Sequence, residues 1–409
     1  MQPERAMGVD GDTDRSPHDR GIRRFTGKRT PMSRLVNWKP LAERLRSEIG
    51  EWIKTDAIRE AFANTPRHLF IPRYLDYTFD EDAKRTRWVP VEDPDPDLIY
   101  SNTAFVTQVQ PGAAGGTDMI STSSSSMPGL MADMIEELSI KPGMRVVEIG
   151  TGTGYNAAIL CHIVGAANVA TTDIDPELVE SAKNRLNKLG YHPTFTPEEG
   201  SYDRLIATHA VDNIPYEWVR WLKPGGVMLA DLRARNPMSH IAAWAIVTVD
   251  DNGTTATGKL LPPRGGFMGA RRTLRHADHD VDTPRKYTDT ARLRTRQVIH
   301  PKAILDDAEF EFFLWRSMPS AVWSRPWPPG KHEDPEDQRQ VMTRDGRWTS
   351  VSAIDAGYMT PDDLWGDIEL AYDKWTDAGK PGLDAYNITV NTDGHTVVEL
   401  AVSGAEDTA

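Results

Sequence analysis

The stretch of sequence that decides the fold is Val146–Tyr155, which reads VVEIGTGTGY. Its first four residues predict a short buried strand, and the apolar residues 156–164 that follow predict a helix. Glycine allows a sharp turn and lets a ligand approach the backbone without a Cβ in the way. Open α/β sheets bind ligands at the carboxyl ends of their strands. The stretch therefore predicts a ligand-binding loop between a strand and a helix.

The position of the third glycine, Gly154, indicates which ligand this loop binds. A dinucleotide-binding loop has that glycine one position later, where this chain has Tyr155, to cradle a pyrophosphate. The acidic Glu148 ahead of the loop suits a ligand with an ammonium group and no phosphate. Asp173 follows about 20 residues later, at the end of the next predicted strand, where a carboxylate can accept hydrogen bonds from both ribose hydroxyls. The pattern predicts an S-adenosylmethionine site, and a plain strand-to-helix turn is the alternative.

Composition and charge narrow the class of protein. The chain has 409 residues, of which 39% are hydrophobic and 26% charged, and its net charge of -13 argues against a nucleic-acid substrate. The single cysteine, Cys161, excludes an intrachain disulfide framework. No His, Asp and Glu cluster has metal-ligand spacing, so no metal is expected. No apolar run approaches the roughly 20 residues that span a bilayer, and we expect a cytoplasmic protein without membrane contact.

The chain divides into four predicted regions. Residues 1–32 predict a disordered lead-in. Residues 33–129 predict an N-terminal helical segment with substrate-side loops, of which residues 80–118 form a long loop or lid. Residues 130–240 alternate strands and helices, which predicts a Rossmann-like, mostly parallel sheet with helices on both faces. Residues 241–409 predict an appended α+β accessory region, a candidate for peptide recognition, which the sheet does not need for its own closure.

Several segments resemble the protein-L-isoaspartate O-methyltransferase family. The similarity covers roughly residues 38–235. Its motifs are Ile58–Phe62, Thr65–Pro72, Lys141–Gly143, the glycine-rich stretch, Asp173–Leu178, Tyr202–Ile206, Ile214–Pro215 and Leu222–Gly226. The resemblance implies a class I methyltransferase fold, S-adenosyl-L-methionine as cofactor, and methyl transfer to a carboxylate.

One departure from the family pattern marks the candidate substrate site. The family has a Thr-Ile-Ser-x-Pro segment whose serine helps to hold the substrate carboxylate. This chain instead has a run of hydroxyl residues, Ser121–Ser126, followed by Met127 and Pro128. The resemblance makes Ser126 the counterpart of the family serine, and the candidate catalytic residues are Ser124, Ser125 and Ser126. A flexible polar linker is the alternative interpretation of the run.

A second departure concerns the adenine side of the cofactor site. The family's Gly-Asp-Gly loop after the third strand is absent. Either the adenine pocket is built differently, with Glu198 or Glu199 as candidates, or the sequence lacks a mobile loop at this point. The residues expected to bind the cofactor are Glu148, Gly150, Thr151, Gly152, Gly154, Tyr155, Asp173, Ile174 and Glu199.

The serine run, residues 80–118 and the C-terminal extension resemble a divergent branch of the family. Its members accompany biosynthetic clusters for ribosomally made peptides such as lanthipeptides, lasso peptides and graspetides. The resemblance implies methylation of an aspartate in a modified precursor peptide, after which the ester closes to an aspartimide that hydrolyses to isoaspartate. Three alternatives are a repair enzyme for isoaspartate in aged proteins, a nicotinamide-dependent oxidoreductase, and a catalytically silent peptide-binding module.

Other residues are weaker candidates for substrate contact. His209 ends the fourth predicted strand, where a packed or solvated side chain is the favoured interpretation. The basic stretch Arg264–Arg275 suits an acidic peptide, and a solvated loop is the alternative. The C-terminal tryptophans are Trp315, Trp323, Trp327, Trp365 and Trp375. They could line a peptide surface, although core packing is favoured for the two on the last predicted helix.

Overall fold

A computed structural model describes most of the chain. The described residues are 37–80, 85–111, 119–233, 242–262, 265–271, 293–297, 304, 307–318, 321–324, 339–343, 347–351, 355–359 and 364–401. The predicted lead-in at residues 1–32 lies outside them, as do Trp327 and residues 272–275 of the predicted basic stretch.

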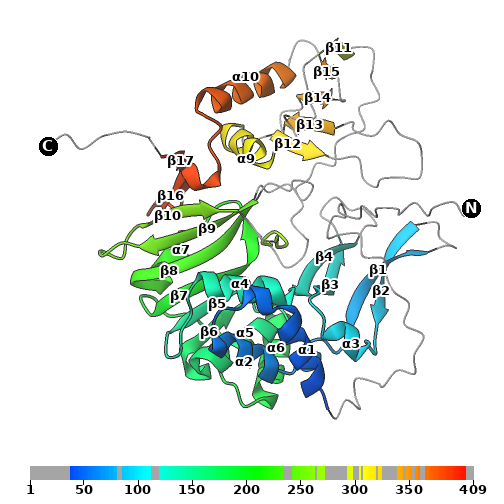
Figure 1. Ribbon diagram of the computed structural model, residues 1–409, viewed down its shortest axis with the longest axis vertical. Coiled ribbons are helices and arrows are strands. Elements are labelled where there is room, and N and C mark those ends of the chain that lie inside the picture. The colour runs from blue at the N-terminus through cyan, green and yellow to red at the C-terminus, as the bar shows by residue number, and fades with distance from the viewer. Residues whose placement is uncertain are drawn as a thin grey trace, which may run out of the picture.

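An eight-stranded sheet with the order β17-β16-β10-β9-β8-β7-β5-β6 forms the centre of the molecule (Figure 1). Its parallel strands are β5 (Val146–Ile149), β6 (Val169–Thr172), β7 (Tyr202–Val211) and β8 (Leu222–Arg233). Antiparallel strands continue it: β9 (Ala242–Val249), β10 (Ala256–Leu261), β16 (Tyr386–Val390) and β17 (Thr396–Leu400). The predicted Rossmann-like α/β fold is confirmed, but the sheet is mixed and not mostly parallel, because the strands that follow residue 241 join it in antiparallel pairs.

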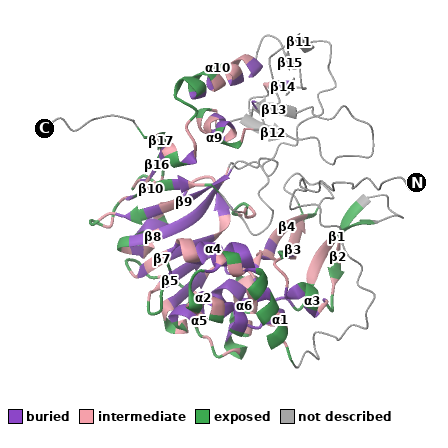
Figure 2. Cartoon of the chain, in the orientation of Figure 1, coloured by how far each residue is buried: buried purple, intermediate pink, exposed green. Residues whose placement is uncertain are grey.

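Helices cover both faces of this sheet, because its strands are apolar on both sides. Successive residues of a strand point to opposite faces, so Val146 packs in one core and Val147 in the other. The first core holds α1 (Lys39–Glu48), α2 (Asp56–Asn64), α4 (Pro128–Glu137) and α5 (Tyr155–Val164). The second holds α7 (Tyr216–Trp221), α9 (Ala308–Ser317) and α10 (Leu364–Asp377). In Figure 2 the central strands of the sheet are mostly coloured as buried, whereas the helices around them also carry exposed residues.

The sheet crosses the boundary predicted at residue 240. Strands β9, β10, β16 and β17 all come from residues after 241 and pair into the same sheet. Trp365 and Trp375 are buried in the core that the sheet shares with α7, so they pack as favoured from the sequence but fill no separate core. The residues after 241 therefore extend the central sheet, although hairpin signals alone could not show which edge they would join.

A smaller sheet also lies in the C-terminal part of the chain. Its order is β11-β15-β14-β13-β12. The strands are β11 (Leu293–Gln297), β12 (Ala321–Ser324), β13 (Arg339–Thr343), β14 (Trp348–Val351) and β15 (Asp355–Met359).

The N-terminal part folds into a four-stranded antiparallel sheet where a loop was predicted. Its order is β2-β1-β3-β4, with α3 (Pro96–Ile99) between β2 and β3. The strands are β1 (Tyr74–Asp80), β2 (Arg85–Val91), β3 (Phe105–Pro111) and β4 (Met119–Ser125). The loop prediction for residues 80–118 is wrong for the described part. Its Asp and Pro residues lie partly at the ends of helices and strands: Asp95, for example, caps α3 by accepting a hydrogen bond from Asp97 N.

Strand β4 contains most of the serine run, so the linker interpretation of that run is wrong. Short hydroxyl side chains tolerate the strand conformation once a neighbouring strand supplies the hydrogen bonds, and β3 pairs with β4 from Phe105 to Pro111.

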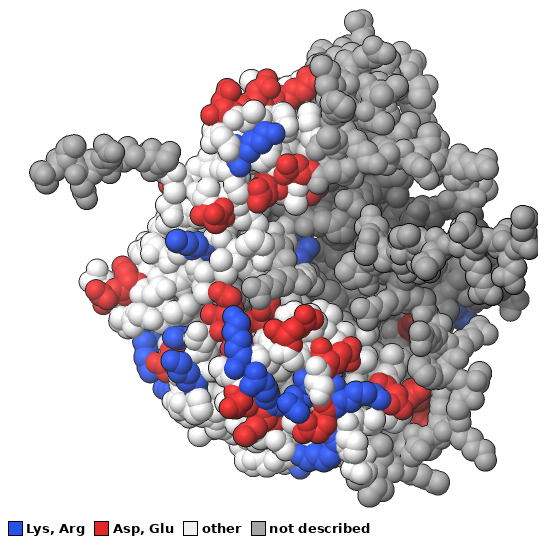
Figure 3. Space-filling view, in the orientation of Figure 1, with Lys and Arg blue, Asp and Glu red and all other residues white. Residues whose placement is uncertain are grey.

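On the face seen in Figure 3, Lys and Arg side chains are interspersed with Asp and Glu over the described residues. Within the described part of the chain, no helix is long and apolar enough to cross a membrane.

Candidate functional site

The three glycines of the loop between β5 and α5 have different roles. Their backbones have φ values of +99°, +50° and +85° at Gly150, Gly152 and Gly154, a region that disfavours other residues. A Cβ on Gly150 would lie 2.6 Å from Thr208 Oγ1, and one on Gly154 would lie 2.9 Å from Ala182 Cβ. Of the three, Gly152 alone has room for a Cβ, because its nearest neighbour, Ser124 O, would lie at an ordinary van der Waals distance of 3.5 Å. The outer two glycines serve packing, and Gly152 faces the cavity.

Asp173 follows β6 and holds the glycine loop in place. Its Oδ2 accepts a hydrogen bond from Gly152 N at 2.9 Å, and its Oδ1 accepts one from Asp175 N at 3.1 Å. A carboxylate oxygen accepts up to two hydrogen bonds, so both oxygens retain capacity for a ligand. Asp175 caps α6 (Pro176–Lys188) by accepting a hydrogen bond from Glu177 N.

Glu148 lies under the loop and is fully buried. Its two oxygens accept hydrogen bonds from Asn156 Nδ2 at 2.8 Å and Thr171 Oγ1 at 2.6 Å. Burial raises the pKa of Glu148 to about 7, against the lowering effect of these two hydrogen bonds. Thr151 Oγ1 lies 2.7 Å from Thr171 Oγ1 and joins the same network.

A cavity of about 560 Å³ opens at the carboxyl ends of the parallel strands. This volume is in the range of small-molecule and cofactor sites. Its lining includes Thr122–Met127, Glu148–Thr153, Asp173, Ile174, Thr208, His209, Glu217, Trp218 and Gly266–Arg271. The charged side chains among these lining residues are three carboxylates and one guanidinium, that of Arg271.

The serine run forms one wall of this cavity. Ser124 and Ser126 are half-buried and line it. Ser125 is only 2% exposed, and its hydroxyl has no hydrogen-bond partner among the described residues. Ser123 accepts a hydrogen bond from Thr107 Oγ1 at 3.3 Å. The reachable hydroxyls of the predicted catalytic set are therefore those of Ser124 and Ser126.

Arg67 fixes the position of this wall from within the protein. Its fully buried guanidinium donates to the carbonyl oxygens of Ile99, Ser101, Thr103 and Ser126, at 2.6 to 3.2 Å. Burial lowers the pKa of Arg67 to about 10. Sequence reasoning identified Arg67 only as part of a motif, because the four carbonyls lie 32 to 59 positions away.

Residues 265–271, which we call the strap, form another wall. Phe267 N donates to Asp231 Oδ2 at 2.9 Å, and Ala210 exchanges backbone hydrogen bonds with Met268 and Ala270. Burial raises the pKa of Asp231. These contacts fix the strap across the carboxyl ends of β7 and β8.

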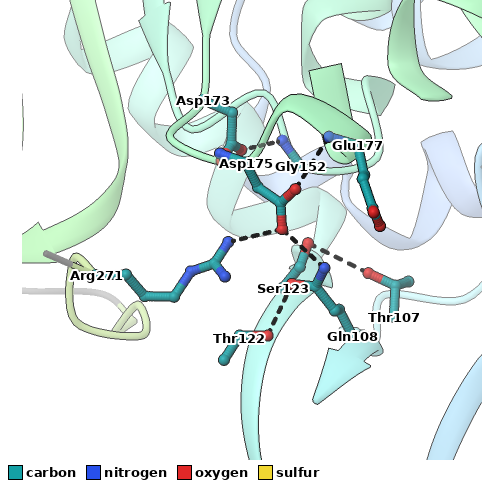
Figure 4. Close-up of polar contacts among 9 residues, drawn as sticks. All are labelled: Thr107, Gln108, Thr122, Ser123, Gly152, Asp173, Asp175, Glu177 and Arg271. Atoms are coloured by element: carbon teal, nitrogen blue, oxygen red, sulfur yellow. Dashed lines mark hydrogen bonds and ion pairs between the residues drawn. The ribbon is translucent and has the colours of Figure 1, made fainter. Parts of the chain in front are cut away.

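Asp175 connects three walls of the cavity (Figure 4). Its Oδ2 accepts a hydrogen bond from Gln108 Nε2 of β3 at 2.9 Å and lies 3.5 Å from Arg271 NH2 of the strap. Gln108 in turn accepts from Thr122 Oγ1 of β4 at 2.8 Å. The side chains of Arg271 and Asp175 are 8% and 7% exposed, so this ion pair is shielded from water. The N-terminal sheet, the cofactor loop and the strap therefore share one buried polar network.

Some predicted site residues lie elsewhere. Glu199 pairs with Arg220, and Glu198 pairs with Arg145 at 3.2 Å, so neither lines the cavity and the adenine-side prediction for Glu199 is wrong. The chain passes directly from the bridge between Ala170 and Thr194 into β7, which leaves those glutamates on the outer surface. Tyr155 lines the cavity, but its ring packs against Phe62 edge-on and against Phe70 at a tilt, in the core of the N-terminal helices.

His209 lines the cavity at the end of β7. Its ring meets Trp218 edge-on at 5.7 Å, and burial lowers its pKa. Burial therefore favours the uncharged form of the imidazole.

The cavity fits S-adenosylmethionine. Asp173 offers acceptors for ribose hydroxyls, and Ile174 beside it is 44% exposed within the lining, an apolar surface for an adenine ring. The three carboxylates suit a ligand that carries sulfonium and ammonium charges.

Comparison with known proteins gives the same result. The model of the family "Protein-L-isoaspartate(D-aspartate) O-methyltransferase" matches residues 97–243. Protein-L-isoaspartate O-methyltransferase 2 of Archaeoglobus fulgidus is 30% identical, with the match covering 56% of this chain and 95% of the relative. The enzyme of Pyrococcus horikoshii is 33% identical over 47% of this chain and 76% of its own.

A solved protein-L-isoaspartate O-methyltransferase has 18% identity and a TM-score of 0.48, over 88% of this chain and 100% of its own. The similarity to the archaeal relatives, nearly full-length for one of them, agrees with the glycine loop, Asp173 and the serine wall. The chain belongs to the protein-L-isoaspartate O-methyltransferase family and is an S-adenosylmethionine-dependent carboxyl O-methyltransferase.

Proposed function

We propose that this enzyme methylates an aspartyl side-chain carboxylate in a ribosomally made, modified peptide, and that the ester then closes to an aspartimide that hydrolyses to isoaspartate. The observation that carries the proposal is the contact between the serine wall and the cofactor loop. A Cβ added at Gly152 would lie 3.5 Å from Ser124 O and 3.7 Å from Ser123 Oγ. A carboxylate held by this wall therefore lies beside the loop that binds the methyl donor.

The residues of this site orient a nucleophile that needs no activation. A peptide aspartate has a pKa near 3.9 and is ionised at pH 7, so no general base is required. The cofactor supplies an electrophilic methyl group. Ser124 and Ser126 offer hydroxyl donors that can hold the carboxylate without adding a competing charge. Holding reactants in line at close range can supply several kcal/mol of rate acceleration, which is the main task left to the protein.

The walls that distinguish this enzyme support a specialised peptide substrate. The strap lies beyond the residues 97–243 that the family model matches, and the aligned part of the Archaeoglobus relative accounts for 56% of this chain. The C-terminal region thus contributes a cavity wall as well as sheet strands, in line with the role in peptide recognition proposed for it.

Repair of isoaspartate in aged proteins is the second candidate function. It needs the same cofactor site and the same wall for a carboxylate, and the names of the archaeal relatives favour it.

One competition separates the two candidates. The enzyme is incubated with S-adenosylmethionine, a linear isoaspartyl peptide, and a ribosomal precursor peptide before and after enzymatic cyclisation, and methyl esters are detected by mass spectrometry. Selective methylation of the cyclised peptide is expected. Turnover of the linear isoaspartyl peptide alone would establish the repair function instead.

A further inference from the structure

Four apolar side chains gather at the outer end of the N-terminal sheet, and we call them the apolar patch: Tyr77, Phe79, Trp88 and Met119. Tyr77, Phe79 and Met119 are 53%, 51% and 41% exposed. Tyr77 and Phe79 lie two positions apart on β1 and so share one face. Trp88 lies opposite Tyr77 on β2, with its ring centroid 4.7 Å away. In Figure 2 this part of β1 is coloured as exposed.

The patch is joined to β4 by a specific contact. Trp88 Nε1 donates a hydrogen bond to Met119 O at 2.8 Å, which brings the β1–β2 hairpin onto the first residue of β4. Among the described residues, the other large exposed apolar side chains are Leu98, Ile174 and Leu370, on three separate elements. Clustered exposed apolar side chains mark interaction sites, whereas single ones are ordinary.

Strand β4 leads from this patch into the cavity. Six positions separate Met119 from Ser125, about 20 Å along an extended strand. Met119 belongs to the apolar patch, while the residues from Thr122 to Met127 line the cavity. A peptide whose target carboxylate lies beside the serine wall must continue away from the cavity, and β4 provides a continuous surface for it.

We propose that the apolar patch binds apolar side chains of the substrate peptide that lie about six residues from the methylated position. The proposal rests on the proposed function, because it takes a peptide as the substrate. Tyrosine and tryptophan suit this task since their rings offer a large apolar contact with a polar edge. An extended peptide rises about 3.3 Å per residue, so the spacing of its anchor from the target follows from the length of β4.

The test compares the double variant Tyr77→Ser/Phe79→Ser with Leu370→Ser, which removes an equally exposed side chain from α10. The probes are two isoaspartyl peptides of equal length. One carries two Leu-Phe pairs, one placed six residues before the isoaspartate and one six residues after it. The other carries Ser-Ser at both places. We expect wild type and Leu370→Ser to bind the Leu-Phe peptide with a Kd about ten-fold lower, measured by fluorescence anisotropy with S-adenosylhomocysteine present. The double variant should lose that difference while its affinity for S-adenosylhomocysteine stays unchanged.

Equal Kd values for the two peptides in wild type, or a preference that survives in the double variant, would overturn the proposal. A concentration-dependent wild-type dimer that the double variant loses, seen by light scattering, would assign the patch to a second copy of the chain instead. This binding measurement needs no turnover. Failure to methylate the cyclised precursor would therefore count against the proposed function alone, whereas the anisotropy result decides whether the apolar patch binds peptide.

Discussion

The two sides of the cavity are built in different ways. The cofactor side comes from one continuous stretch, residues 146–175, in which β5, the glycine loop and β6 position their own side chains. The substrate side brings together Arg67, strands β3 and β4, and the strap, which are far apart in the sequence. A local motif can therefore specify cofactor binding, whereas substrate selection depends on the tertiary fold around it.

We expect the largest effect, a loss of cofactor affinity, from a substitution on the cofactor side of the cavity. Asp173→Ala removes the acceptor for Gly152 N and the proposed ribose contacts, and charge-assisted hydrogen bonds contribute about 1.5–3 kcal/mol each. We expect S-adenosylmethionine to bind at least about 100-fold more weakly by calorimetry. Glu199→Ala is the matched control, since Glu199 lies outside the cavity, and it should bind the cofactor like wild type. Wild-type affinity in Asp173→Ala would remove the basis for the site.

Two glycine substitutions separate binding from folding. Gly152→Val places a side chain at the open position of the loop, so we expect loss of cofactor binding. Gly154→Ala meets Ala182 in α6 and forces a positive φ, which costs about 1–3 kcal/mol of stability. We expect a lower melting temperature but near-normal cofactor affinity per folded molecule. The opposite pattern would mean that Gly154 faces the ligand.

A smaller effect is expected on the substrate side. Ser126→Ala removes a hydroxyl donor to the carboxylate, and we expect kcat to fall about ten-fold, the effect of one hydrogen bond to a charged group. Cofactor affinity should not change. Ser125→Ala is the comparison: its hydroxyl is buried and unpartnered among the described residues, so its loss should leave stability equal or higher. Unchanged turnover in Ser126→Ala would assign that serine a purely structural role.

The raised pKa of Glu148 predicts a pH-dependent cofactor affinity. The carboxyl group is mostly neutral at pH 6 and mostly ionised at pH 8, and only the ionised form attracts a cationic ligand. Affinity should rise about ten-fold over this range, the equivalent of one pKa unit, and should stay flat in Glu148→Gln. Because folding raises this pKa above 4.5, the stability that the neutral group contributes at low pH is lost as pH rises through about 7. Calorimetry and urea unfolding between pH 5 and 8 measure both trends.

The smallest effect tests the contact between the two sides. Arg271→Met breaks the ion pair with Asp175, one contact between the strap and the cofactor side, while Gln108 and Glu177 N still bind Asp175. We expect peptide kcat/KM to fall about five-fold, with partial recovery in Arg271→Lys. Cofactor affinity should change less than two-fold. An equal loss of both would show that the strap belongs to the cofactor side.

The contrast between the two sides also explains what the sequence could predict. The glycine loop, Asp173 and the cap at Asp175 follow from local chemistry, since strand, turn and helix are neighbours in the chain. The role of Arg67 could not be predicted, because its acceptors are backbone carbonyls, which every residue has. The serine run could equally be a linker by its composition, because the strand it forms depends on pairing with β3, which the sequence does not show. Glu199 was misplaced because a missing family loop gave no information on where the remaining residues would point.

The last hairpin of the sheet has a consequence for synthesis of the chain. Strand β10 pairs with β16, which is made about 120 residues later. Until the ribosome has released β16 and β17, β10 is an edge strand with unpaired backbone groups, and such edges recruit other chains. Deleting residues 386–401 should therefore cause aggregation before it affects the cofactor loop. The C-terminal hairpin thus covers β10 and moves the edge of the sheet to β17, where the exposed Glu399 places a charge among the apolar residues.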